Sequence, residues 1–264
     1  MCEVQPGGRE PGTIQGHGPD PPTTIFPLPD APRLHTSGRV NDCERPVPFA
    51  TETGPVPGTL AESAADLLVL PMSAEGGASA GSTESGLTGV LPAPLDDLFA
   101  HYALTGKPGE TAQFPVPRDE GLVRLALLGV GTGSPDDLRK AGAALARVAR
   151  GRRRVAFAWP EAGEEAATAF AEGALLASYT FTLKSEKTPE SKRPAPRIDV
   201  VGGEGVADAL DRGVHLATAT ALARDLINTP SRSKTPEWMA ERAGEVARDS
   251  GLQVTGWGEE DLRG

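Results

Sequence analysis

The sequence predicts an α/β fold in which a mixed or parallel sheet is flanked by helices. Three apolar runs have the length expected of strands that are buried on both faces: Ala65 to Met72, Val123 to Val130 and Arg154 to Trp159. Helical patterns follow the second and third runs. Because strands that alternate with helices of this length form parallel βαβ units, these observations indicate one α/β domain.

The helix after the second run is marked at both ends. A glycine-rich turn leads to Ser134, which suits the N-cap, and Pro135 suits the first helical position, where no amide donor is needed. The acidic pair Asp136–Asp137 then lies at the positive end of the helix dipole. Apolar residues from Leu138 to Ala149 line one face, and Gly151 ends the helix.

The following segments repeat the alternation of strand and helix. A second helix begins near Glu161, and the polar, proline-broken stretch 184–197 predicts an exposed loop before a short strand, Ile198 to Val201. A long helix then runs from Gly205 to Ile227. It ends at Thr229, because a residue that precedes a proline is pushed out of the helical region.

A further helix and strand are expected near the C-terminus. Thr235 suits the cap of this helix, Pro236 lies in its first turn, and Gly251 closes it. Leu252 to Thr255 has the pattern of another strand, so a new α/β unit begins there.

Residues 1–58 differ in composition from the rest of the chain. They hold 12 of the 25 prolines and 8 glycines, and their apolar clusters are too short to form a core. We therefore predict a disordered tail. It fits either an interaction arm or upstream sequence translated from an early start codon, and composition does not distinguish the two.

The charge balance argues against nucleic acid as a general partner. Lysine and arginine number 26 against 36 aspartates and glutamates, which gives a net charge of -10 and a pI near 5.0. A chain with this charge repels phosphate backbones on average. The net charge does not exclude a local basic patch.

The sequence predicts a cytoplasmic protein without a membrane span. Every apolar run is far shorter than the roughly 20 residues that cross a bilayer. The N-terminus lacks the basic and apolar regions of a secretory signal. Cys2 and Cys43 both lie in the predicted tail, which argues against a disulfide framework and a cysteine-based metal site.

Two glycine patterns match functional motifs only in part. Gly77 to Gly81 spells G-x-S-x-G, the nucleophile elbow, but no helical pattern follows it. Gly129, Gly131 and Gly133 lie between a strand and a helix, where glycines cradle phosphates. The third glycine of G-x-G-x-x-G would fall on Ser134, however, so a capped βα turn is favoured over a phosphate site.

The sequence shows no catalytic or metal-binding constellation. No dense set of carboxylates follows a strand end, as a two-metal site requires. The basic run Arg150 to Arg154 lies at a helix end, where cations suit the dipole, and a solvated structural role is favoured. We assign no catalytic, cofactor-binding or metal-binding residue. The histidines are scattered: His17, His35, His101 and His215.

The stretch from Leu222 to Gly264 resembles the junction segment of the M17 leucyl aminopeptidases, also called cytosol aminopeptidases. The matching core is ARDLINTP at Ala223 to Pro230, followed by Thr235–Pro236. The resemblance is specific from about residue 172 to residue 264 and diffuse from 60 to 171. The earlier segment that resembles the end of the family's N-terminal domain holds Glu172, Gly173, Ala174, Leu176, Tyr179, Phe181 and Lys184.

This resemblance implies a macro-like N-terminal α/β domain, a long linker helix and a catalytic domain, assembled as a hexamer. It divides the chain into a tail (1–58), a macro-like domain (59–203), a linker helix (204–230) and the truncated beginning of the catalytic domain (231–264). Three residues of the junction signature are expected to orient the linker helix against the next domain. They are Arg224, Asp225 and Asn228.

The resemblance also implies an activity whose residues lie elsewhere. The family's catalytic domain binds two divalent metals, zinc or manganese, through Asp, Glu and Lys, and activates a water that hydrolyses the N-terminal bond of peptide substrates. None of those motifs falls on this sequence, so we expect the chain to be inactive alone. The alternative is a stand-alone macro-like module, either a regulator or a binder of a nucleotide or ADP-ribose. True macro domains usually have an asparagine close to the first strands. Here the only asparagines are Asn41 in the predicted tail and Asn228 at the junction, which argues against nucleotide or ADP-ribose binding.

Overall fold

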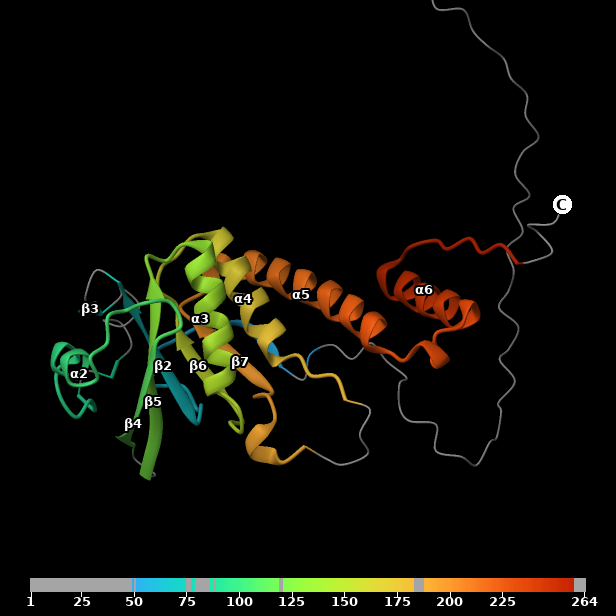
Figure 1. Cartoon of the computed structure of the whole chain (residues 1–264). Helices are drawn as coiled ribbons and strands as arrows, with labels where there is room; N and C mark the ends of the chain where they lie inside the picture. The colour runs from blue at the N-terminus through green and yellow to red at the C-terminus, as the bar shows by residue number, and fades with distance from the viewer. Residues whose placement is uncertain are drawn as a thin grey trace, which may run out of the picture. The chain divides into compact units, whose positions relative to one another are not determined.

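The described part of the chain forms one twisted sheet with helices on both faces (Figure 1). The computed structural model describes residues 49, 51–74, 77–78, 86–87, 89–118, 121–182 and 188–258, all within a compact unit that spans 41–264. The strands among these residues are β1 (Glu52–Val56), β2 (Leu67–Ser73), β3 (Gly77–Ala78), β4 (Thr111–Arg118), β5 (Gly121–Gly131), β6 (Val155–Ala158) and β7 (Arg197–Val201).

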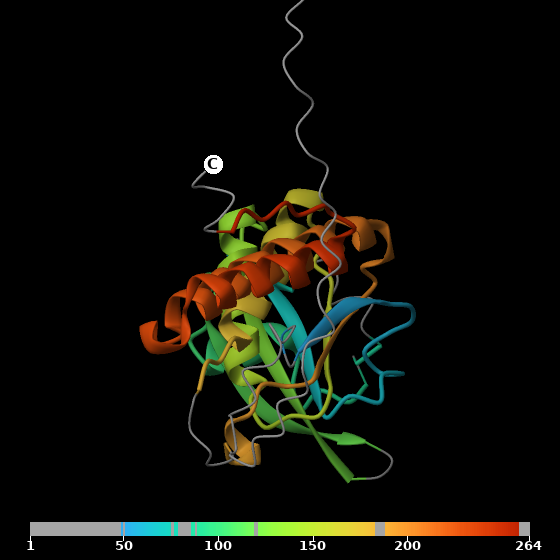
Figure 2. The same cartoon turned by 90° about the vertical axis from the view of Figure 1, so that its right-hand side faces the viewer.

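The sheet is mostly parallel. Its order is β1-β7-β6-β2-β5-β4, and β3 pairs with β2. All neighbours are parallel except β4, which is antiparallel to β5, and β3, which is antiparallel to β2. Figure 2 shows the strands splayed by the twist of the sheet. The edge strand β4 carries Pro115 and Pro117, which suit an edge because proline offers no amide to a further strand.

Five α-helices and three short 3-10 turns complete the described part of the chain. The helices are α2 (Leu95–His101), α3 (Pro135–Val148), α4 (Glu164–Ser178), α5 (Ala207–Asn228) and α6 (Pro236–Ser250), and the turns are η1 (Glu190–Lys192), η2 (Glu204–Val206) and η3 (Ser231–Ser233).

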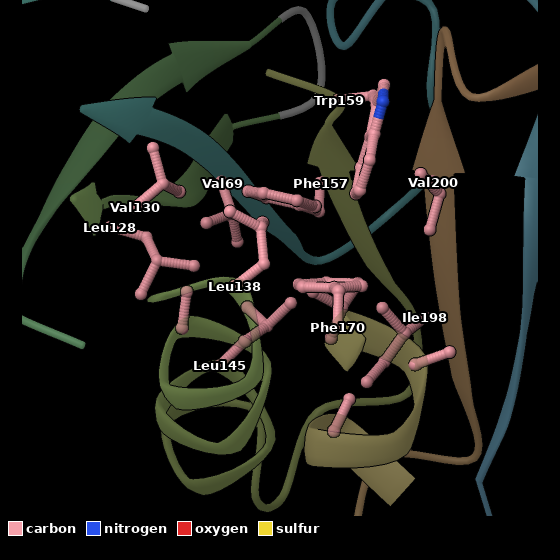
Figure 3. Packing of buried hydrophobic residues seen from close by; sticks show 14 of the residues in the cluster. Val69, Leu128, Val130, Leu138, Leu145, Phe157, Trp159, Phe170, Ile198 and Val200 are labelled. Carbon is pink, nitrogen blue, oxygen red and sulfur yellow. The ribbon is translucent and has the colours of Figure 1, made fainter. Parts of the chain in front are cut away.

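The alternation of side chains along the strands creates two cores. On β2, Leu67 and Val69 face a core shared with α3, α4 and α5, whereas Leu68 and Leu70 face a second core that includes Leu98 of α2. Figure 3 shows the first core, where side chains of the sheet meet those of α3 and α4. At its centre the rings of Phe157 and Phe170 stack, with centroids 4.8 Å apart.

The direction of each connection explains which face each helix covers. The steps β5-α3-β6 and β6-α4-β7 move the same way across the sheet, so right-handed crossovers place α3 and α4 on the same face. The step from β2 to β5 moves in the opposite direction. Its connection, which contains α2, therefore lies on the other face.

Helix caps agree with the sequence. The hydroxyl of Ser134 accepts a hydrogen bond from the amide of Asp137, and that of Thr235 accepts one from the amide of Trp238. Gly251 closes α6 in the left-handed region with φ 66°. These findings confirm both helix starts and the C-terminal end of α6 that the sequence predicts.

Two expectations about the ends of the chain are wrong. Strand β1 lies inside the range 1–58 that the sequence predicts as a disordered tail, and it pairs in parallel with β7. Its formation depends on a partner some 145 residues later, which local composition does not reveal. Residues 252–255 form no strand, because no neighbouring strand is present in the described part of the chain to pair with them. The rest of the predicted tail, 1–48 and residue 50, lies outside the described residues.

The helices α3, α4 and α5 approach one another closely at three glycines. A β-carbon at Gly142 would overlap the carbonyl oxygen of Phe170, and one at Gly173 would overlap the carbonyl oxygen of Arg139. At Gly213 a β-carbon would overlap backbone of α4 at Thr168. The packing of the three helices therefore requires residues without a side chain at these positions.

We predict that Gly173→Ala lowers the free energy of unfolding by about 2 kcal/mol or more, because the new methyl group forces α3 and α4 apart. The matched control is Gly244→Ala in α6, where no atom lies within 4 Å of the added carbon. That change should stabilise the helix by about 0.5–1 kcal/mol through helix propensity. Urea unfolding followed by circular dichroism measures both, and equal effects of the two substitutions would contradict the packing account.

Candidate functional site

The carboxyl ends of the parallel strands are where α/β folds bind ligands. In this chain the end of β5 carries Gly129 and Gly131, but the chain itself covers them. The amide of Gly131 donates to the carbonyl of Gly106 at 3.0 Å, and the amide of Gly109 donates to the carbonyl of Gly129 at 2.9 Å. A β-carbon at Gly129 would overlap the carbonyl oxygen of Lys107. These glycines therefore admit the backbone of loop 104–110 rather than a phosphate.

The carboxylate of Asp137 lies at the position of an anion at the start of α3. It accepts hydrogen bonds from the amide of Thr132 at 3.0 Å and from the Thr132 hydroxyl at 2.9 Å. Burial raises the pKa of the Asp137 carboxyl, but hydrogen bonds from Thr132 and Ser134 and the charge of a nearby lysine lower it more, so its pKa lies below the ordinary value. The turn is a capped helix start, as the sequence favoured.

A small hollow lies beside this loop, between the end of β2 and α2. Its volume is about 190 Å³, below the roughly 300–1,000 Å³ of pockets that hold small molecules. The exposed Asp96 is the titratable side chain in its lining. The lining residues are Met72, Ser73, Asp96, Phe99, Leu104, Thr105 and Gly106.

Potential metal ligands do not cluster in the described part of the chain. No group of three or more His, Cys, Asp or Glu side chains lies together there. His101 ends α2 and contacts the ring of Tyr102 edge to face at 4.9 Å, and His215 is exposed on α5. His17 and His35 lie outside the described residues, and so does most of the G-x-S-x-G pattern, of which Gly77–Ala78 forms β3.

The junction signature forms a hydrogen-bonded cluster around Tyr179, just after α4. The Tyr179 hydroxyl donates to Oδ1 of Asp225 at 2.7 Å and accepts from Nδ2 of Asn228 at 3.3 Å. The guanidinium of Arg224 lies 5.5 Å from the centroid of the Tyr179 ring and donates to the carbonyl of Leu176 at 3.4 Å. Burial, followed by the hydrogen bond to Asp225, raises the pKa of Tyr179.

In this cluster Arg224, Asp225 and Asn228 contact the preceding helix, whereas the sequence predicts that they face the domain that follows. Their contacts fix the C-terminal half of α5 to the end of α4, within the described domain. An orientation against a following domain stays a prediction. The contact with Tyr179 joins residues 46 positions apart, so the signature alone does not identify it.

Lys234 is a further junction residue that the sequence did not single out. Its ammonium group donates to the carbonyls of Leu226 at 3.1 Å and Ile227 at 3.3 Å, in the last turn of α5. A cation there satisfies free carbonyls and suits the helix dipole. The hydroxyl of Thr229 also donates to the carbonyl of Asp225, at 2.7 Å, and so caps the same helix end. The sequence signal for Lys234 is a basic residue that follows shortly after a predicted helix end.

Comparison with known proteins places this domain in a family. Residues 74–187 match the cytosol aminopeptidase family, N-terminal domain. A probable cytosol aminopeptidase from Syntrophotalea carbinolica is 35% identical over 195 residues, which cover 68% of this chain and 38% of that protein. Another from Leifsonia xyli is 33% identical over 219 residues, which cover 81% of this chain and 42% of that protein.

Solved structures share the fold. A mutant of tomato leucine aminopeptidase matches with a TM-score of 0.59 at 22% identity, covering 75% of this chain and 42% of that one. The bottromycin maturation enzyme BotP in complex with Mn matches with a TM-score of 0.54 at 25% identity, covering 72% and 38%. The chain therefore carries the N-terminal domain of the cytosol aminopeptidase (M17) family, and it spans about two fifths of the curated relatives that it matches.

No helix in the described part of the chain is both long and apolar enough to cross a membrane.

We predict that Asp137→Asn lowers the free energy of unfolding by about 1 kcal/mol at neutral pH, because the amide accepts the Thr132 hydrogen bonds more weakly. A carboxyl whose pKa is lower in the folded state stabilises the protein above its unfolded pKa, and this contribution is lost as the pH falls through the folded pKa. The difference between wild type and variant should therefore shrink below about pH 4.

Urea unfolding at neutral and acidic pH measures this difference. The control is Asp136→Asn, whose side chain is 84% exposed and pairs only with Arg139 on the surface. It should change stability by less than about 0.5 kcal/mol. A difference for Asp137→Asn that is equally large in acid would show that the carboxylate charge is not the cause.

Proposed function

We propose that the chain is the N-terminal portion of a metal-dependent leucyl aminopeptidase, which removes N-terminal amino acids from peptides. The observation that carries this proposal is the match of residues 74–187 to the family's N-terminal domain. Relatives named as probable cytosol aminopeptidases support it. The division into a macro-like domain, a linker helix at 204–230 and the beginning of a catalytic domain at 231–264 is part of the proposal, with the start of the macro-like domain moved to β1.

In this proposal the described portion acts as a scaffold for a peptidase domain. Helix α5 is held to α4 by the close approach at Gly213 and by the Tyr179–Asp225 hydrogen bond. Pro230 ends α5, and Thr235 caps α6. A long helix that is fixed along its length gives the segment that follows a defined starting position and direction, which supports a scaffold role.

The described residues do not fit a metal centre. Asp225, a carboxylate of the junction, already accepts from Tyr179, and no cluster of potential ligands lies among the described residues. BotP, a structural neighbour, is described in complex with Mn. We therefore propose two divalent metals, manganese or zinc, for the complete enzyme, bound outside the described residues, and we assign no catalytic step to this chain.

Further properties of the complete enzyme are proposals of the same kind. Peptides are the proposed substrates, a homo-oligomer of hexameric form is the proposed assembly, and the cytoplasm is the proposed location. The names of the relatives, cytosol aminopeptidases, support the location and the substrate class.

The second candidate is a stand-alone macro-like module that binds a nucleotide or ADP-ribose. Two observations weaken it. The glycines at the end of β5 are covered by loop 104–110, and the neighbouring hollow of about 190 Å³ is smaller than a nucleotide site. Saturable heat on titration of the full chain with ADP-ribose would favour this candidate over the scaffold.

A fusion protein tests the scaffold proposal. The full chain is joined to the part of the Syntrophotalea carbinolica relative that follows the aligned region, and hydrolysis of leucine p-nitroanilide is measured with manganese. We expect the fusion to be active and the chain alone to be inactive, because this chain supplies the scaffold and the relative supplies the metal-binding residues. Size-exclusion chromatography with light scattering reports the assembly of the fusion.

The control is the same fusion with Gly173→Ala, which disturbs the contact between α3 and α4 without touching the added part. It should lose activity or stability. Turnover by the chain alone would contradict the proposal, and so would a well-folded wild-type fusion without turnover.

A further inference from the structure

Two basic segments that are distant in sequence lie side by side at the amino ends of β6 and β7. Residues 147–154 contain five arginines, and residues 188–197 contain two arginines and one lysine, with Glu190 as their one acidic residue. The amide of Gly151 donates to the carbonyl of Arg193 at 2.9 Å, and a β-carbon at Gly151 would lie 2.9 Å from Ser191. In Figure 1 the short helical turn that precedes β7 lies near the lower end of that strand, at the end of the domain where α3 ends.

Two of these arginines form ion pairs with carboxylates of the fold. Arg154, which precedes β6, and Arg197 of β7 both bind the buried carboxylate of Asp199, at 2.5 and 2.6 Å, and Arg197 also pairs with Glu52. Asp66 accepts hydrogen bonds from the amides of Arg153 and Arg154 and so holds the start of β6. Asp66 and Asp199 are therefore engaged in structure, whereas Glu190 is exposed.

The remaining cations make no ion pair with a carboxylate among the described residues. All are exposed except Arg152, which is partly buried and whose Nε has no hydrogen-bond partner among them. We call this group the basic pole, and it consists of Arg147, Arg150, Arg152, Arg153, Lys192 and Arg193.

The concentration of positive charge is notable in a chain whose net charge is -10. The two segments 147–154 and 188–197 are net positive, so the rest of the chain carries a larger negative charge than the total. The basic pole is therefore opposite in charge to the rest of the molecule. The sequence favoured a solvated role for Arg150 to Arg154 alone. The structure places the second segment beside the first, and like charges that gather without a carboxylate partner among the described residues favour an anionic partner.

We propose that the basic pole is a docking surface for an acidic peptide segment of a partner protein. Guanidinium groups predominate at the pole, and their planar forks match carboxylates in paired hydrogen bonds. A short acidic segment experiences the local field of the pole, because screening at physiological salt limits interactions to about 8 Å. This interaction goes beyond the scaffold role and is independent of peptidase activity.

Nucleic acid fits the pole less well. A long polyanion extends beyond the pole and meets the negative charge of the remaining surface. The two segments, 147–154 and 188–197, contain no aromatic residue on which a base could stack. Both observations favour carboxylates over a phosphate backbone as the ligand.

The test uses the full chain and a fluorescein-labelled octaglutamate peptide with blocked ends. Fluorescence anisotropy should show binding at low ionic strength that weakens steeply as salt rises. The double variant Arg150→Glu/Arg153→Glu should weaken binding by about tenfold or more, because it removes two positive charges and adds two negative ones at the pole. Arg150→Gln/Arg153→Gln should give a smaller loss, and its thermal unfolding shows whether the fold is intact.

The matched control is Arg232→Glu/Arg248→Glu, which changes the net charge equally at exposed positions outside the pole. It should leave binding within about twofold of wild type. Three results would overturn the proposal: no binding of the peptide by wild type, an equal loss in the control, or tighter binding of a duplex DNA of matched charge, which would make nucleic acid the ligand.

Discussion

Gly142 on α3, Gly173 on α4 and Gly213 on α5 lie where each helix meets the backbone of its neighbour. The close approach at these positions allows the three helices to form a continuous layer over one face of the sheet, and it places Phe170 against Phe157 in the core. Because α5 is part of this layer, the chain leaves the domain along a helix that is already packed. The Tyr179–Asp225 hydrogen bond extends the same attachment to the end of α5. The junction is thus a continuation of the core.

The charge distribution follows from the same architecture. The acidic residues that suit helix dipoles lie in the first turns of α3 and α4, after the carboxyl ends of the strands, and Arg147 lies in the last turn of α3. The first turns of α3 and α4 thus place carboxylates after the carboxyl ends of the strands, and the end of α3 places a cation near their amino ends. Asp199 binds Arg154 and Arg197, whereas the basic pole makes no ion pair with a carboxylate in the described part of the chain.

The sequence predicts the elements whose signals are local. The strands β2, β5, β6 and β7 and the capped starts of α3 and α6 are confirmed, because buried runs and cap residues act within a few positions. Strand β1 was missed because its partner is distant, and the covering of Gly129 and Gly131 by loop 104–110 depends on contacts between separate segments. The family was identified from the junction signature, yet the side-chain partner of Asp225 required the structure.

The central claim is that α5 unfolds together with the N-terminal domain as one cooperative unit, whereas α6 does not. Hydrogen exchange followed by mass spectrometry on the full chain tests it directly. We expect peptides from the first four turns of α5 to open with the same free energy as β5 and β6, because helices packed in one core unfold as one unit. Peptides from α6 should exchange much faster, since only Ala247 of that helix is buried among the described residues. Exchange of α5 as fast as that of α6 would contradict the account.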